Sequence, residues 1–190
     1  MYNKNKGMIK MSTIFIGGAR EIKILPEKVE NKLKNIYNKN YSIVVGDANG
    51  IDKIVQQYFY SHNYNNIKVF VSNGNARNNV GNWEVENIKV SSKLKGFDFY
   101  KEKDLAMANV ADIGFMIWNC RSKGTLNNMI NLLTLNKELI VYLTVLNSLK
   151  KIESLDKLLD LLINYAPDTI DIYKSLLLDK FNKIEQLKLL

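Results

Sequence analysis

The chain has 190 residues, of which 46% are hydrophobic and 24% charged, and its formal net charge is +8. This composition is typical of a soluble globular domain with a sizeable core, and no run approaches the roughly 18 apolar residues of a membrane span. The single Cys120 excludes an internal disulfide. With no signal-like segment after the basic N-terminus, we expect a cytoplasmic protein without a membrane partner.

Apolar runs and helical spacings alternate along the first two thirds of the chain. We expect a flexible tail over residues 1–11 and then one domain over residues 12–148. Short β-branched runs predict five strands, at residues 13–16, 42–45, 67–71, 113–118 and 139–143. Apolar residues at helical spacing predict helices at residues 26–37, 51–62, 98–109 and 125–135. Residues 72–97 are polar, rich in Asn and Gly, and predict a long functional loop.

This alternation predicts an α/β fold, namely a Rossmann-like open and mostly parallel five-stranded sheet with helices on both faces. Residues 149–190 carry two apolar stripes at helical spacing, separated by Pro167, and predict a C-terminal helical hairpin. Two interpretations remain open for this hairpin. It packs on the edge of the sheet, or it joins two copies of the chain.

Three glycine turns each follow a predicted strand and precede a helix. The first is GGAR, with Gly17, Gly18 and Arg20, and the third is RSKGT, with Ser122, Gly124 and Thr125. In open α/β sheets such turns meet at the carboxyl ends of the strands, where ligands bind. Free N–H groups at a helix start favour a phosphate or a carboxylate. A structural turn or a plain helix cap is the alternative for each motif taken alone.

The second turn, GDANGID, is the most specific of the three. Gly46 ends a strand, Asp47 stands at its tip, and Ala48 and Gly50 lead into the next helix. Asp47 is placed to accept hydrogen bonds from ribose hydroxyls or a base amine, and Asp52 serves equally well as a ligand contact or a first-turn helix stabiliser.

The three arginines of the chain, Arg20, Arg77 and Arg121, all lie in or beside the glycine loops and the long polar loop. Arginine binds phosphate and carboxylate groups through paired donors, so this placement favours a compact anionic ligand over a long polyanion. Asn78 offers an amide for a base edge or a ribose, and Trp83 offers a stacking surface or a core side chain. His62 is the sole histidine, so neither a Cys–His nucleophile nor a metal cluster is expected.

The order GGAR, GxAxGxD, Arg-Asn and SxGT, over residues 12–143, resembles the SLOG superfamily. That group includes the DNA-processing protein A fold, the Lonely Guy phosphoribohydrolases and nucleotide-sensing domains of some bacterial immune effectors. The resemblance implies a nucleotide site formed by the three glycine loops with Arg77 and Asn78, and a homo-oligomer. Function varies within the superfamily, so the resemblance does not determine it.

The chain departs from the phosphoribohydrolase pattern where a catalytic Glu would stand. Asn128 occupies that position, and an amide cannot replace a carboxylate as a general base. We therefore expect a binding module that senses or sequesters a nucleotide or a molecule derived from NAD or ADP-ribose, without a cofactor. An alternative is a nucleotide N-glycosidase or hydrolase that uses Asp47 or Asp104. A third hypothesis, suggested by the net charge, is single-stranded DNA binding.

Overall fold

A computed structural model describes residues 11–188, with the side chains up to residue 182. The predicted tail therefore lies outside the described residues apart from Met11. Seven strands form one sheet in the order β4-β3-β2-β1-β5-β6-β7. Neighbours from β4 to β6 run parallel, and β7 pairs antiparallel with β6. The strands are β1 (Thr13–Gly18), β2 (Ser42–Gly46), β3 (Ile67–Ser72), β4 (Glu84–Ile88), β5 (Ile113–Trp118), β6 (Glu138–Leu143) and β7 (Ser148–Ile152).

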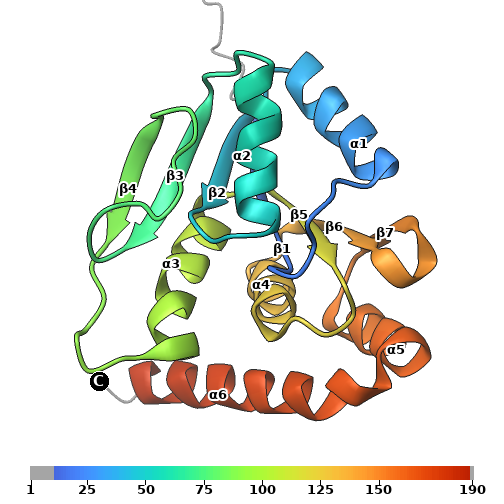
Figure 1. Ribbon diagram of the computed structural model, residues 1–190. Coiled ribbons are helices and arrows are strands. Elements are labelled where there is room, and N and C mark those ends of the chain that lie inside the picture. Colours follow the sequence, from blue (N-terminus) through green and yellow to red (C-terminus); the bar gives the residue numbers. More distant parts are fainter. Residues whose placement is uncertain (1–10, 189–190) are drawn as a thin grey trace, which may run out of the picture.

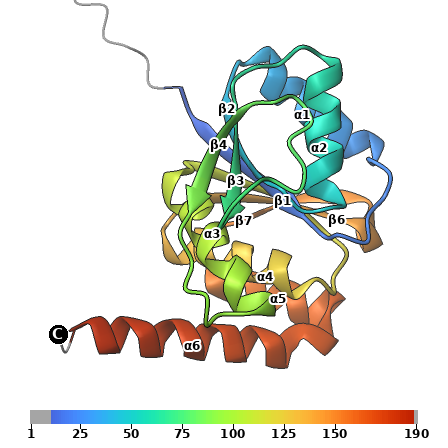
Figure 2. The same ribbon diagram turned by 60° about the vertical axis from the view of Figure 1, so that its left-hand side comes forward.

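Helices cover both faces of this sheet (Figure 1). The helices are α1 (Glu27–Asn38), α2 (Ile51–Ser61), α3 (Gly96–Val110), α4 (Lys123–Thr134), α5 (Leu155–Tyr165) and α6 (Ile170–Lys188). The first two lie on one face, and α3 and α4 lie on the other with α5 and α6 beside them (Figure 2). The predicted α/β architecture, with a mostly parallel sheet and a C-terminal helical hairpin, is confirmed.

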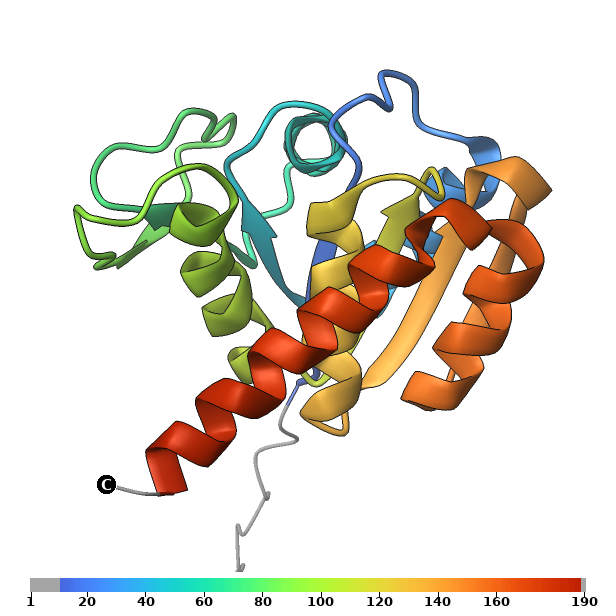
Figure 3. The same cartoon turned by 90° about the horizontal axis from the view of Figure 1, so that it is seen from below.

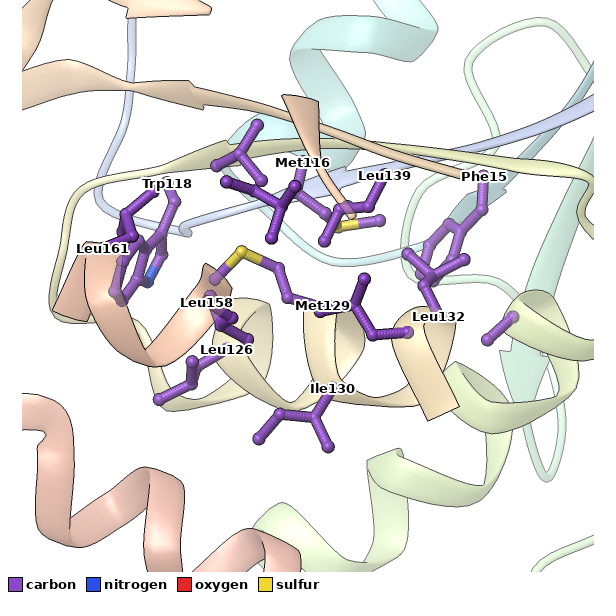
Figure 4. Packing of buried hydrophobic residues seen from close by; sticks show 14 of the residues in the cluster. Phe15, Met116, Trp118, Leu126, Met129, Ile130, Leu132, Leu139, Leu158 and Leu161 are labelled. Atoms are coloured by element: carbon purple, nitrogen blue, oxygen red, sulfur yellow. The ribbon is translucent and has the colours of Figure 1, made fainter. Parts of the chain in front are cut away.

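Two apolar cores follow from this layering. Val29 and Leu33 of α1 and Val55 of α2 pack against one face of the sheet. On the other face, α4 presents Leu126, Met129 and Leu132, among the side chains drawn in Figure 4. Helix α4 is buried along most of its length, which explains its Leu, Met and Ile content, although Asn127, Asn128 and Asn131 are buried as well.

The sheet has two more strands than predicted. Strand β4 lies in the predicted long polar loop, and β7 lies where the helical hairpin was predicted to begin. Both are edge strands, and each leaves most of its side chains exposed or half-buried. Their sequences, Glu-Val-Glu-Asn-Ile and Ser-Leu-Lys-Lys-Ile, therefore lack the apolar run that marks a buried strand. Charged residues on an edge also discourage pairing with other chains.

The hairpin packs onto the domain itself. Leu158 and Leu162 of α5 and Tyr173 and Leu176 of α6 are buried in the same core as α4. Helix α6 runs across the outer side of α4 (Figure 3), and Lys180 donates to Asn131 there. No helix among the described residues is both long and apolar enough to cross a membrane.

Candidate functional site

The strand order reverses between β1 and β5, so the loops that leave these strands run in opposite directions. Such a reversal opens a crevice at the carboxyl ends of the strands. A cavity of about 670 Å³ lies there, lined by Gly17 and Gly18 from the end of β1 and by Asn119 and Gly124 from beyond β5. Its volume falls within the range of about 300–1,000 Å³ that is usual for small-molecule sites.

All three arginines of the chain line this one cavity. Arg77 is paired with a carboxylate, whereas Arg20 and Arg121 have no carboxylate partner within the described part of the chain. The same is true of Lys123, which also lines the cavity and lies over the Phe97 ring at 4.4 Å. Cations without an internal partner at a cavity mouth attract an anionic ligand.

The N-terminus of α4 adds donors to the same side of the cavity. Ser122 caps the helix, since its hydroxyl accepts from the Thr125 backbone N–H at 3.3 Å. Gly124 follows in the first turn, and a Cβ added there would have no heavy atom within 4 Å. The first backbone N–H groups of a helix lack intrahelical acceptors and carry the positive end of its dipole. This corner is therefore suited to a phosphate.

An aromatic side chain stands between the arginine loops. The Tyr100 ring of α3 lies 5.3 Å from Arg20 Cζ and 4.6 Å from Arg77 Cζ, measured to the ring centroid. Tyr100 and Phe97 both line the cavity. Cation–π contacts of this kind hold arginine side chains in place without neutralising their charge.

Charged groups also line the floor of the cavity. Lys103 of α3 is buried, and its Nζ lies 3.1 Å from Asp104 Oδ1. Burial alone would lower the pKa of this lysine, but the carboxylates of Asp104, Asp52 and Asp47 outweigh it and raise the pKa. Lys103 therefore keeps its positive charge inside the protein, as a buried cation does only when it is paired.

Asp52, in the first turn of α2, lines the same floor. Burial raises the pKa of its carboxyl to about 6, opposed by the attraction of Lys103 and assisted by the charge on Asp104. Its Oδ2 accepts from the Ala48 backbone N–H at 3.2 Å. The carboxyl thus takes up or releases a proton near neutral pH while it faces the cavity.

Asp47 does not itself line the cavity, and its carboxylate is paired with Arg77. Arg77 donates to its carboxylate from Nε at 2.9 Å and from Nη2 at 2.7 Å, and the backbone N–H of Arg77 donates as well at 3.2 Å. Burial raises the pKa of Asp47, but these hydrogen bonds and the charge on Lys103 lower it by more, so that the pKa lies below its ordinary value. Two of these hydrogen bonds end on Oδ2 and one on Oδ1, so the carboxylate of Asp47 holds Arg77 in position.

Three other predicted site residues support the loops from behind. A Cβ on Gly46 would lie 2.8 Å from Lys103 Nζ, so this glycine makes room for the buried lysine. Gly50 packs against the Arg20 backbone, which joins the first and second glycine loops. Asn78 donates from Nδ2 to the Asp47 backbone carbonyl at 2.8 Å. None of the three lines the cavity.

The structure places Trp83 away from this cavity. Its side chain is buried in the core on the α1–α2 face, and Nε1 donates to the Tyr64 backbone carbonyl at 2.9 Å. Trp83 immediately precedes the edge strand β4, and its large side chain fills space in the core between the sheet and the α1–α2 layer. The expected stacking role at the cavity does not fit this position.

The cavity therefore brings together most of the residues that the sequence singled out. Those in its lining are Gly17, Gly18, Arg20, Ala48, Arg77, Asp104, Ser122, Gly124, Thr125 and Asn128. The cavity is also lined by residues that were not predicted as ligand contacts, among them Glu21, Phe97, Tyr100, Lys103, Asn119 and Arg121. Arg121 and Asn119 had a sequence signal, since they flank the third glycine turn. The α3 residues had none, because their approach to the strand ends is a tertiary effect.

No protein-family model matches the chain, and no curated protein sequence is significantly similar to it.

Proposed function

We propose that the protein binds a nucleotide, or a small molecule derived from NAD or ADP-ribose, at the carboxyl ends of β1 and β5. The observation that carries the proposal is the convergence of all three arginines and the N-terminus of α4 on one cavity. Arg20, Arg121 and Gly124 would hold phosphate oxygens, and Tyr100 and Phe97 would contact the base. The resemblance to the SLOG superfamily supports the same site.

The carboxyl groups in the cavity lining favour a ligand that carries hydrogen-bond donors as well as negative charge. Asp52 and Asp104 line the same cavity as Arg20 and Arg121, and carboxylates accept hydrogen bonds from hydroxyl or amine groups. A nucleotide carries both kinds of group, phosphate oxygens at one end and sugar or base donors at the other. The protein would act as a sensor or as a sequestering protein, and the resemblance implies a homo-oligomer.

Calorimetric titration of AMP, ADP, ADP-ribose and NAD into the wild type and into Arg121→Ala tests this proposal. Hydrogen bonds to charged groups contribute about 1.5–3 kcal/mol, so we expect Arg121→Ala to weaken the best-bound compound by at least about tenfold. Lys150→Ala is the matched control, because it removes one exposed charge on β7 outside the cavity. If no compound binds, or if Arg121→Ala binds as the wild type does, the site is wrongly assigned.

A second candidate function, hydrolysis of a bound nucleotide, is favoured by the carboxyl groups of Asp52 and Asp104 in the lining. Asp104 was expected from the sequence, and Asp52 has a pKa of about 6, which suits proton exchange near neutral pH. Asp47 is a weaker candidate because Arg77 occupies its carboxylate. Product formation that survives both Asp52→Asn and Asp104→Asn would exclude this chemistry.

Single-stranded DNA binding has less support. The arginines converge on a cavity of about 670 Å³, which fits one small ligand better than a polymer.

A further inference from the structure

Asp52 lines the cavity without a cation paired to it. Arg77 is paired with Asp47 at 2.7 Å, and Lys103 is paired with Asp104 at 3.1 Å. Within the described part of the chain, no ion pair joins Asp52 to a cation. The two cations next to Asp52 therefore each have a carboxylate of their own, and a negative charge on Asp52 is in excess in this part of the cavity.

The first turn of α2 holds the Asp52 carboxyl in a fixed place. Its Oδ2 accepts from the Ala48 backbone N–H at 3.2 Å. A Cβ built on Gly46 would meet both Asp52 Oδ2 and Lys103 Nζ, so the absence of a side chain at Gly46 lets the carboxyl and the ammonium group lie side by side. Because the carboxyl is held at the edge of the cavity, its charge acts on any group that enters.

Charged groups from several elements surround this carboxyl. Lys103 and Asp104 come from α3, Asp47 from the loop before α2 and Arg77 from the loop after β3. The same cavity is lined by Arg20 and Glu21 from the loop after β1, and by Arg121 and Lys123 at the start of α4. The unpaired arginines thus belong to the loops after β1 and β5, whereas the excess carboxyl belongs to α2.

An anionic ligand in this cavity would add negative charge near Asp52. Arg20 and Arg121 line the cavity and would hold its phosphate oxygens. An ionised Asp52 repels such a group, whereas the protonated carboxyl is neutral and has an O–H to donate to an oxygen of the ligand. The occupied cavity therefore favours the protonated form.

We propose that ligand binding in this cavity is coupled to protonation of Asp52, so that the protein takes up a proton with an anionic ligand and binds it more weakly as the pH rises. This inference rests on the proposed function, because it needs the anionic ligand of that site. The coupling is reciprocal, since the proton raises the affinity for the ligand by the same factor by which the ligand raises the affinity of Asp52 for the proton.

The pKa of Asp52 in the free protein sets the pH window. Burial raises this pKa to about 6, and an anion in the cavity raises it further. At an effective dielectric constant of about 20, a single negative charge roughly 9 Å away shifts a carboxyl pKa by about one unit. The affinity is then highest below about pH 5, falls about tenfold as the pH rises through 6 and 7, and is constant above about pH 8.

Calorimetric titration of AMP, ADP, ADP-ribose and NAD at pH 5, 6.5 and 8 tests the coupling in the wild type and in Asp52→Asn. The amide is neutral, as the protonated carboxyl is, so the ratio of wild-type to Asp52→Asn affinity cancels any titration of the ligand itself. For the compound that binds, we expect this ratio to fall about tenfold between pH 5 and pH 8.

Asp156→Asn is the matched control. Asp156 also lies in the first turn of a helix, but it is exposed on α5 and outside the cavity. The ratio of wild-type to Asp156→Asn affinity should therefore be the same at all three pH values.

Proton uptake gives a second readout of the same coupling. Titrations at pH 6.5 in buffers of different ionisation enthalpy measure the protons bound with each ligand. The wild type should take up about half a proton more per ligand than Asp52→Asn, because the pKa values of the free and the occupied site lie on either side of this pH.

The outcomes separate this inference from the proposed function. Nucleotide binding with the same pH profile in the wild type and Asp52→Asn would overturn the coupling and leave the site in place. A ratio that rises with pH would also overturn it, and would show that the ionised Asp52 accepts a hydrogen bond from the ligand. Absence of binding to the wild type at every pH would overturn both proposals.

Discussion

Replacing Gly50 by alanine should destabilise the protein more than any other single methyl addition in the glycine loops. Gly50 has φ 79° and ψ −131°, the mirror image of the extended region, which glycine alone adopts readily. Holding another residue there costs about 1–3 kcal/mol. In addition, the new Cβ would lie 2.5 Å from Arg20 O and closer still to Arg20 Cα, both of them backbone atoms that cannot rotate away.

We therefore expect Gly50→Ala to lower the free energy of unfolding by at least about 3 kcal/mol, because the backbone strain and the displacement of the first glycine loop add together. Urea denaturation followed by circular dichroism measures this change. Gly124→Ala is the matched control, since its Cβ would meet nothing within 4 Å. It should change stability by less than about 1 kcal/mol, towards higher stability. Equal stabilities of the two variants would refute the interlocking of the loops.

Further predictions concern the buried charges and the cap. Arg77→Ala removes the main partner of the buried Asp47. Because the Arg77 side chain is 38% exposed and Lys103 stays 4.0 Å from Asp47, we expect the free energy of unfolding to fall by about 1–3 kcal/mol in urea denaturation, and an unchanged value would contradict this. The pKa of Asp52 is raised to about 6, so the folded state holds its proton more tightly than the unfolded state. Ionisation therefore lowers the free energy of unfolding of the wild type as the pH rises from about 4 to 6. Relative to the wild type, the free energy of unfolding of Asp52→Asn should rise by up to about 3 kcal/mol across that window and stay at that level above it. A constant difference between pH 4 and 8 would contradict the shift. Ser122→Ala removes the α4 cap and should cost about 1 kcal/mol, measured by thermal unfolding.

The order of strands and helices was predictable because each core strand is a short apolar run, and β1, β2 and β5 are each followed by a glycine turn. Residues 113–118 illustrate this, since the predicted and observed bounds of β5 coincide. The edge strands escaped prediction because pairing on one side does not require an apolar sequence. Val85 of β4, for example, is exposed although it lies in the sheet.

The candidate site was predictable where it depends on the strand ends and less so where a helix packs over them. The convergence of Arg20, Arg77 and the third glycine turn follows from the topology of a parallel sheet. Lys103 could not be found in this way. A lysine in a polar helix usually lies in solvent, and this one is buried beside its neighbour Asp104 and beside Asp47 and Asp52, which lie far from it in the sequence. Asp52 gains its raised pKa from the same surroundings.

Mass spectrometry of a nucleotide mixture tests the central claim most directly. The pure protein would be incubated with AMP, ADP, ADP-ribose and NAD and removed by filtration, and the retained protein would then be denatured to release what it held. We expect one compound to be depleted from the filtrate and recovered unchanged from the wild type, and to remain in the filtrate with Arg20→Ala/Arg121→Ala. A filtrate identical to the starting mixture would contradict nucleotide binding, and recovery of a free base or a sugar phosphate would show an enzyme instead of a binding module.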